Sequence, residues 1–185
     1  MRKIIFQTLT SVDGYFEGPG REIDWHNVDT EFNQFARDFL NNVDILLFGR
    51  VTYQLMADYW PTDNALKDDP VIAAKMNSIK KIVVSKTLQK AEWNNTVLIK
   101  ENVEEKIRKL KALPGKSIAI FGSSDLAVSL MKNNLVDEFR IFINPLILGR
   151  GKTVFKGLKE RYKLKLLNSK TFTSGNVILY YAPAQ

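Results

Sequence analysis

The feature that most constrains the fold of this chain is a set of short, uninterrupted apolar runs. They are rich in Ile, Val and Phe, and they occupy residues 45–48, 82–84, 97–99 and 118–121. Runs of this length and composition are typical of strands that are buried on both faces. Such strands occur mainly in parallel sheets, which helices cover on both sides. The sequence therefore predicts an α/β domain.

Helical patterns separate these runs. One of them repeats apolar residues at positions i, i+3, i+4, i+7 and i+8, namely Phe32, Phe35, Ala36, Phe39 and Leu40. Asp29 is the expected N-cap of this helix, and Glu31 lies in its first turn. Asn102 and Glu105 form a variant of the capping box that opens a second helix, and Ser123 or Ser124 begins a third.

The C-terminal part predicts strands with no helix between them, at residues 139–148, 162–167 and 177–181. In the second of these, apolar residues alternate with lysines, as in a strand that has one wet face. We therefore expect a three-layer domain over residues 1–185, with a mostly parallel central sheet, helices on both faces and antiparallel C-terminal strands. An exposed part of residues 139–148 could pair with a second copy of the chain.

Composition removes several kinds of chemistry. The 185 residues include no cysteine and one histidine, which excludes disulfides, thiol catalysis, thiolate metal sites and multi-histidine metal sites. The sequence contains no G-x-G-x-x-G, no G-x-x-x-x-G-K-[ST] and no G-x-S-x-G motif. Its N-terminal apolar run is too short for a signal peptide or a membrane span, so we expect a cytoplasmic protein that does not bind a membrane.

The charge is unevenly distributed. Residues 1–79 carry 7 Lys/Arg and 12 Asp/Glu, whereas residues 80–185 carry 20 and 8. A balance of +12 in the second part raises the question of an anionic partner, which could be a nucleic acid, a membrane surface or a phosphorylated small molecule. The basic residues are scattered and no nucleic-acid-binding module is present, so we expect no nucleic acid partner.

Small and polar residues follow three of the buried runs. They are Gly49, Arg50 and Thr52 after the first, Ser85 and Lys86 after the second, and Gly122, Ser123 and Ser124 after the fourth. Ligands of open α/β sheets bind beyond the carboxyl ends of the strands, where the first turn of a helix attracts anions. Any one of these junctions could be a simple capped turn, but three together favour a dinucleotide site.

The order and spacing of these segments, together with several others, resemble the bacterial dihydrofolate-reductase-like reductases. That group includes the C-terminal reductase domain of the bifunctional riboflavin-biosynthesis deaminase/reductase. The matching segments cover nearly the whole chain, and they are S-V-D-G at 11–14, F-G-R-V-T-Y at 48–53, Y-W-P at 59–61, V-S-K-T at 84–87, F-G-S-S at 121–124, L-V-D-E at 135–138 and P-L-I-L-G-R-G at 145–151.

The resemblance implies an NADPH-dependent reductase that transfers a hydride to a small pterin-like or riboflavin-precursor-like substrate, often as a homodimer. It assigns Gly49, Arg50 and Thr52 to the phosphate side of the cofactor, and Ser85 and Lys86 to the 2′-phosphate. The remaining three residues, Gly122, Ser123 and Ser124, would hold the pyrophosphate. A cofactor-binding protein of the same fold without efficient catalysis is the alternative.

Hydride transfer usually also requires a proton for the neighbouring oxygen or nitrogen of the substrate. Asp13 is the expected catalytic residue, although an aspartate that caps the 13–14 turn would have the same sequence signature. Glu17 is a second acidic candidate on that loop. Three aromatic residues, Tyr53, Trp60 and Phe121, could form walls for a planar substrate, and simple core packing is the alternative for them.

Overall fold

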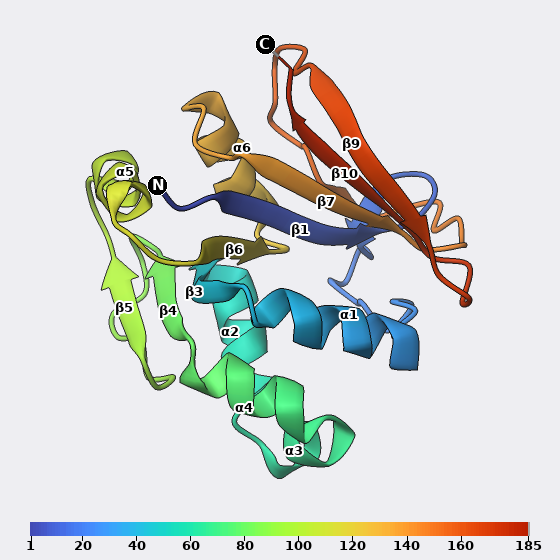
Figure 1. Ribbon diagram of the computed structural model, residues 1–185, viewed down its shortest axis with the longest axis horizontal. Coiled ribbons are helices and arrows are strands. Elements are labelled where there is room, and N and C mark those ends of the chain that lie inside the picture. The colour runs from blue at the N-terminus through green and yellow to red at the C-terminus, as the bar shows by residue number, and fades with distance from the viewer. Residues whose placement is uncertain (185) are drawn as a thin grey trace.

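The fold is built around an eight-stranded sheet. The computed structural model describes residues 1–184, and its strand order is β5-β4-β3-β6-β1-β7-β10-β9 (Figure 1). These strands are β1 (Ile4–Thr10), β3 (Val43–Gly49), β4 (Lys80–Val84), β5 (Thr96–Ile99), β6 (Ser117–Phe121), β7 (Glu138–Ile143), β9 (Leu164–Thr171) and β10 (Val177–Pro183). Every pairing from β5 through β7 is parallel, and β10 is antiparallel to both of its neighbours. The predicted mixed sheet with antiparallel C-terminal strands is therefore confirmed.

Helices cover both faces of the parallel part of the sheet, which explains the continuous apolar runs. In β3, Ile45 and Leu47 join the core beneath α5 (Val103–Ala112) and α6 (Ser124–Lys132), whereas Leu46 and Phe48 join the core on the opposite face. That opposite face carries α1 (Thr30–Leu40), α2 (Arg50–Tyr59), α3 (Asp63–Asp68) and α4 (Pro70–Ser78) (Figure 1). Because successive side chains point to opposite faces, a strand between two helical layers needs apolar residues at every position.

The predicted N-cap is present at the start of one helix and absent at the start of another. The side chain of Asp29 accepts a hydrogen bond from the Phe32 amide at 2.7 Å, so the predicted N-cap of α1 is confirmed. The capping box at Asn102 is wrong, because Asn102 has a left-handed backbone and its side chain makes no capping bond to α5. Glu105 instead pairs with Lys109 one turn along the helix.

The C-terminal strands differ in detail from the prediction. β7 ends at Ile143, and residues 144–151 form a loop that includes Pro145, a residue without an amide for the ladder. β7 lies between β1 and β10, so its backbone edges are occupied and it cannot pair with a second copy. The edge strand at this end of the sheet is β9. All of its residues after Leu164 are exposed, including Leu166 at 53%, so the expected buried face is not formed there. A bulge interrupts its pairing with β10 between Leu166 and Asn168.

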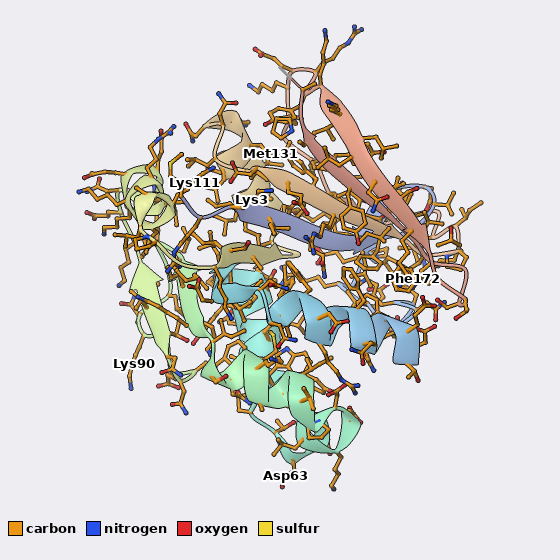
Figure 2. All side chains as sticks on the ribbon, viewed as in Figure 1. Lys3, Asp63, Lys90, Lys111, Met131 and Phe172 are labelled. Atoms are coloured by element: carbon orange, nitrogen blue, oxygen red, sulfur yellow. The ribbon has the colours of Figure 1, made fainter. Side chains whose placement is uncertain are left out.

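A third cluster fills the space between α1 and the C-terminal strands. It joins Phe142 of β7, Ile178 of β10 and Phe172 of the β9–β10 turn to two phenylalanines of α1, Phe32 and Phe35. Figure 2 shows Phe172 at this junction, beside the end of α1. The apolar stripe of α1 therefore binds the antiparallel part of the sheet to the parallel part.

The sequence did not predict α3, α4 or the two short strands β2 (Tyr15–Glu17) and β8 (Lys152–Thr153), which pair with each other outside the main sheet. We call β2 and β8 together the β2/β8 ribbon. No helix within residues 1–184 has the length and apolar character needed to cross a membrane.

Candidate functional site

Two helices begin side by side at the carboxyl edge of the sheet. β3 and β6 are parallel neighbours, with Leu47 opposite Ile120, so both strands end at the same edge. α2 begins directly after β3 at Arg50, and α6 begins after the Gly122-Ser123 turn at Ser124. The two helix N-termini, each carrying partial positive charge, therefore meet at one place.

Two hydrogen bonds hold these helix starts together. The Ser123 hydroxyl accepts from the Gly49 amide at 3.0 Å, and the Thr52 hydroxyl accepts from the Ser123 amide at 3.1 Å. The turn itself is left-handed at two successive residues, with φ of 55° at Gly122 and 45° at Ser123. Thr52 and Ser123 thus use their hydroxyls as acceptors within the protein. Their contribution is to fix the relative position of the two helix N-termini.

Polar groups at this junction remain available for a ligand. Neither α2 nor α6 has a side-chain cap, so their first-turn amides have no partner of that kind. The Ser124 hydroxyl is buried and has no hydrogen-bond partner within the described residues. A buried polar group without a partner costs free energy, which a hydrogen bond to a bound molecule would offset.

These groups line one cavity of about 550 Å³. Gly49, Arg50, Thr52, Ser123 and Ser124 all lie in its wall, so five of the eight predicted cofactor-binding residues are brought together there. Val84, Val103 and Leu126 give the cavity an apolar part. The guanidinium of Arg50 donates to the side chain of Gln54 at 3.0 Å and is otherwise exposed. The cavity therefore combines helix N-termini, a cation and an apolar surface.

The β2/β8 ribbon and the loop that follows β2 form another wall of the same cavity. They contribute Phe16, Glu17, Arg21 and Lys152. Lys152 pairs with Asp125 in the first turn of α6 at 3.1 Å, and its ammonium group lies 5.5 Å from the Phe16 ring centroid. Of these ribbon and loop residues, the sequence predicted only Glu17. The strands of the ribbon are too short to produce a hydrophobic pattern, and they are far apart in the chain.

The remaining predicted cofactor residues lie outside the cavity lining. Gly122 belongs to the turn beneath it, and a Cβ there would meet the Thr52 side chain at 3.7 Å. The Ser85 hydroxyl is buried and accepts from the amides of Thr87 and Leu88 at 3.2 and 3.0 Å, so it closes a turn after β4. Lys86 is exposed on that turn. Its contact with a 2′-phosphate stays a prediction.

Asp13 also lies outside the cavity lining. Its two carboxylate oxygens accept hydrogen bonds from the amides of Leu148 at 3.1 Å and Gly149 at 2.8 Å. The Ser11 side chain, followed by these two amides, holds the pKa of Asp13 below its ordinary value of 3.8. This geometry favours the alternative of a loop aspartate, and a catalytic role for Asp13 stays a prediction.

The three aromatic candidates, Tyr53, Trp60 and Phe121, all pack against other residues of the protein. Tyr53 is buried below α2, and its hydroxyl accepts from the Trp93 amide at 3.0 Å, so it is not a cavity wall. Trp60 follows the last turn of α2, is half-buried, and points its indole N–H at the sulfur of Met56. Phe121 ends β6 and packs edge-on against Phe39. Neither Trp60 nor Phe121 lines the cavity described above.

The sheet order and the two helical layers define an α/β protein with a dihydrofolate-reductase-like fold. The sequence matches the RibD C-terminal domain family over residues 2–178. The chain belongs to that family.

One relative and two solved structures resemble this chain over nearly its whole length. The chain is 36% identical over 180 residues to the uncharacterized protein YyaP of Bacillus subtilis strain 168, covering 97% of this chain and 94% of YyaP. A putative riboflavin biosynthesis protein from Shewanella sp. PV-4 superimposes with a TM-score of 0.73 at 24% identity over the full length of both chains. The deaminase/reductase of Thermotoga maritima gives a TM-score of 0.70 at 15% identity, over 99% of this chain and 57% of that protein. At these identities the two structures support the fold alone.

Proposed function

We propose that this protein is an NADPH-dependent reductase that transfers a hydride to a small heterocycle of the pyrimidine or pterin type. The observation that carries the proposal is the junction of two uncapped helix N-termini with the unpartnered Ser124 hydroxyl in one cavity. A pyrophosphate has the charge and the acceptor oxygens that such amides and hydroxyls bind. Membership of the RibD C-terminal domain family supports a reductase that acts on compounds of the riboflavin pathway.

The residues present fit a dinucleotide. The first-turn amides of α2 and α6, with Ser124, would hold the pyrophosphate. Arg50 lines the cavity and Lys86 does not, so we assign the 2′-phosphate to Arg50 in place of Lys86. Val84 and Val103 offer an apolar surface to the adenine ring. When bound, NADPH supplies the hydride from its nicotinamide ring. The protein contributes orientation and charge complementarity, which together lower the barrier to transfer.

Glu17 is the candidate for the proton source. It lines the cavity, whereas the other acidic residue there, Asp125, pairs with Lys152 at 3.1 Å. No ion pair of Glu17 is found within residues 1–184. A Glu17→Gln variant should keep its affinity for NADPH and lose turnover by roughly a hundredfold, as expected for removal of a general acid.

Cofactor binding can be tested by titrating NADPH and NADH into the protein and following nicotinamide fluorescence. Arg50→Ala should weaken NADPH much more than NADH, because the two differ by the 2′-phosphate. Arg161→Ala is a matched control, since it removes an exposed guanidinium outside the cavity. Absence of binding at millimolar NADPH, or equal losses for both cofactors with Arg50→Ala, would refute the assignment.

A cofactor-binding protein without efficient catalysis is the second candidate. It is favoured by the position of Asp13, whose carboxylate is engaged by two loop amides outside the cavity. A screen that follows NADPH loss at 340 nm separates the two, with 5-amino-6-(5-phosphoribosylamino)uracil and dihydropterins as acceptors. Tight NADPH binding with no turnover of any acceptor would select the second candidate.

A further inference from the structure

Asp13 joins two segments that are far apart in the chain. It lies in the turn between β1 and β2, and both of its carboxylate oxygens accept hydrogen bonds from the β7–β8 loop, at Leu148 and Gly149. A backbone bond from the Val12 amide to the Leu146 carbonyl, at 2.8 Å, runs beside them. The turn and the loop are therefore connected by three bonds within a few residues.

The turn that presents Asp13 is itself well defined. The Ser11 hydroxyl accepts from the Tyr15 amide at 3.0 Å, and the Gly14 amide donates to the Ser11 carbonyl at 3.0 Å. Gly14 has a φ of 84°, a conformation that a residue with a Cβ adopts only with strain. The carboxylate of Asp13 is thus held in a fixed direction, toward the β7–β8 loop.

Both connected segments continue into the β2/β8 ribbon. Tyr15 pairs with Thr153, and Glu17 pairs with Lys152. The two backbones approach closely at Gly151, where a Cβ would overlap the Glu17 carbonyl oxygen. Phe16, Glu17 and Lys152 of this ribbon line the cavity that faces the N-termini of α2 and α6. The bonds of Asp13 therefore lie at the base of a two-stranded wall of the site.

We propose that Asp13 is a positioning residue, which ties the β1–β2 turn to the β7–β8 loop and so holds the β2/β8 ribbon over the cofactor cavity. Only two β2–β8 residue pairs connect the ribbon strands, and a ribbon this short has little stability of its own. The carboxylate adds two charge-assisted hydrogen bonds, which are stronger than neutral ones. The effect on a cofactor rests on the proposed function, whereas the effect on the ribbon does not.

The test compares Asp13→Ala and Asp13→Asn with Glu31→Ala in the full chain. Glu31 is a matched control, because its carboxylate accepts from the Thr173 amide at 2.9 Å and hydroxyl at 3.0 Å, and joins α1 to the β9–β10 turn. Hydrogen exchange should become at least about tenfold faster at the amides of Leu148 and Gly149 and across residues 15–17 in Asp13→Ala. The Kd for NADPH should rise about tenfold, with a smaller rise for Asp13→Asn, which keeps one acceptor oxygen.

Three outcomes would overturn the proposal. The first is unchanged exchange in both segments of Asp13→Ala. The second is an equal rise in the NADPH Kd for Glu31→Ala, which would indicate a general loss of stability. The third is a loss of turnover with unchanged Kd and unchanged exchange, which would restore Asp13 as the proton donor. If the wild-type protein does not bind NADPH, the proposed function fails, while the exchange comparison still decides the role of Asp13.

Discussion

Asp69 offers the sharpest test of how the helical layer beside the site is held together. One of its oxygens caps α4, accepting from the amides of Val71 at 3.1 Å and Ile72 at 2.9 Å. The other accepts from the guanidinium of Arg37 on α1, at 2.7 and 3.1 Å. The Asp69 side chain is 7% exposed and that of Arg37 is 35% exposed. A single carboxylate thus starts α4 and joins it to α1.

Two substitutions separate these contributions. Asn is as good an N-cap as Asp, so Asp69→Asn should lose only the ion pair with Arg37. We expect a loss of about 1 kcal/mol for it, below the range of about 1.5–3 kcal/mol for bonds to charged groups, because water screens the partly exposed Arg37. Asp69→Ala also loses the cap, which adds about 1 kcal/mol. In a chain of this length, a total of about 2 kcal/mol lowers the Tm by roughly 4–8 °C.

Urea unfolding measured between pH 3 and pH 7 provides the assay. Burial raises the pKa of Asp69, but the Arg37 guanidinium and the two helix amides outweigh it, so the pKa lies below the ordinary value of 3.8. A depressed pKa contributes stability that is complete above the unfolded value and disappears as the pH falls through the folded one. The gap between wild type and Asp69→Asn should therefore shrink below about pH 4. A midpoint for Asp69→Asn equal to the wild type at pH 7, or one for Asp69→Ala no lower than for Asp69→Asn, would refute this account.

Three further predictions concern the site and its support. Thr52→Val removes the hydroxyl that accepts a hydrogen bond from the Ser123 amide at 3.1 Å. The Kd for NADPH in fluorescence titrations should therefore rise by about three- to tenfold. The circular dichroism spectrum should remain unchanged. Gly151→Ala should weaken NADPH binding more than Gly149→Ala. Both glycines have a positive φ, but only a Cβ at Gly151 would overlap the backbone of Glu17. Equal losses for the two variants would contradict a role for the close approach of Gly151 to β2. Burial lowers the pKa of Lys81 from 10.5 to about 8. Between these two pH values the unfolded state binds more protons than the folded state, so the free energy of unfolding should rise with pH. The rise should reach up to about 3 kcal/mol relative to the Lys81→Met variant, which has no titrating group at this position. A pH-independent difference between Lys81→Met and wild type would contradict that linkage.

Much of the fold could be predicted because local pattern and burial agree. The four apolar runs became β3, β4, β5 and β6. β3, β4 and β6 lie inside the sheet between two helical layers, which favours apolar residues at successive positions. β5 is the edge strand, and its Val97 is 48% exposed although its run is apolar. The elements that were missed carry weaker signals. α3 has six residues, and the two strands of the ribbon have three and two, too few for a period to appear. The bulge in β9 opposite Tyr180 and Tyr181 cannot be recognised from the pattern of apolar and polar residues in that strand.

The site was predictable only in part. Glycine and hydroxyl residues after buried strands indicated the helix N-termini correctly, because an α/β sheet places such junctions at one edge. The same pattern does not distinguish a hydroxyl that faces a ligand from one that closes a turn. Ser124 and Ser85 have similar sequence surroundings, yet Ser124 is left without a partner and Ser85 accepts from two amides. In the same way, the sequence does not distinguish a catalytic Asp13 from one that accepts hydrogen bonds from loop amides.

By itself, the sequence determined the layers of this protein, the edge of the sheet where the two helix N-termini meet, and the family to which the chain belongs. These properties depend on residues close together in the chain, so each pattern can be recognised within one short segment of the sequence. Only the tertiary structure shows which of these side chains are engaged in hydrogen bonds within the protein. Thr52 meets Ser123 across 71 positions and Asp13 meets Gly149 across 136, and hydrogen bonds over such separations have no local signature. Those contacts engage Thr52, Ser123 and Asp13 within the protein, and they leave Ser124 without a partner in the described residues.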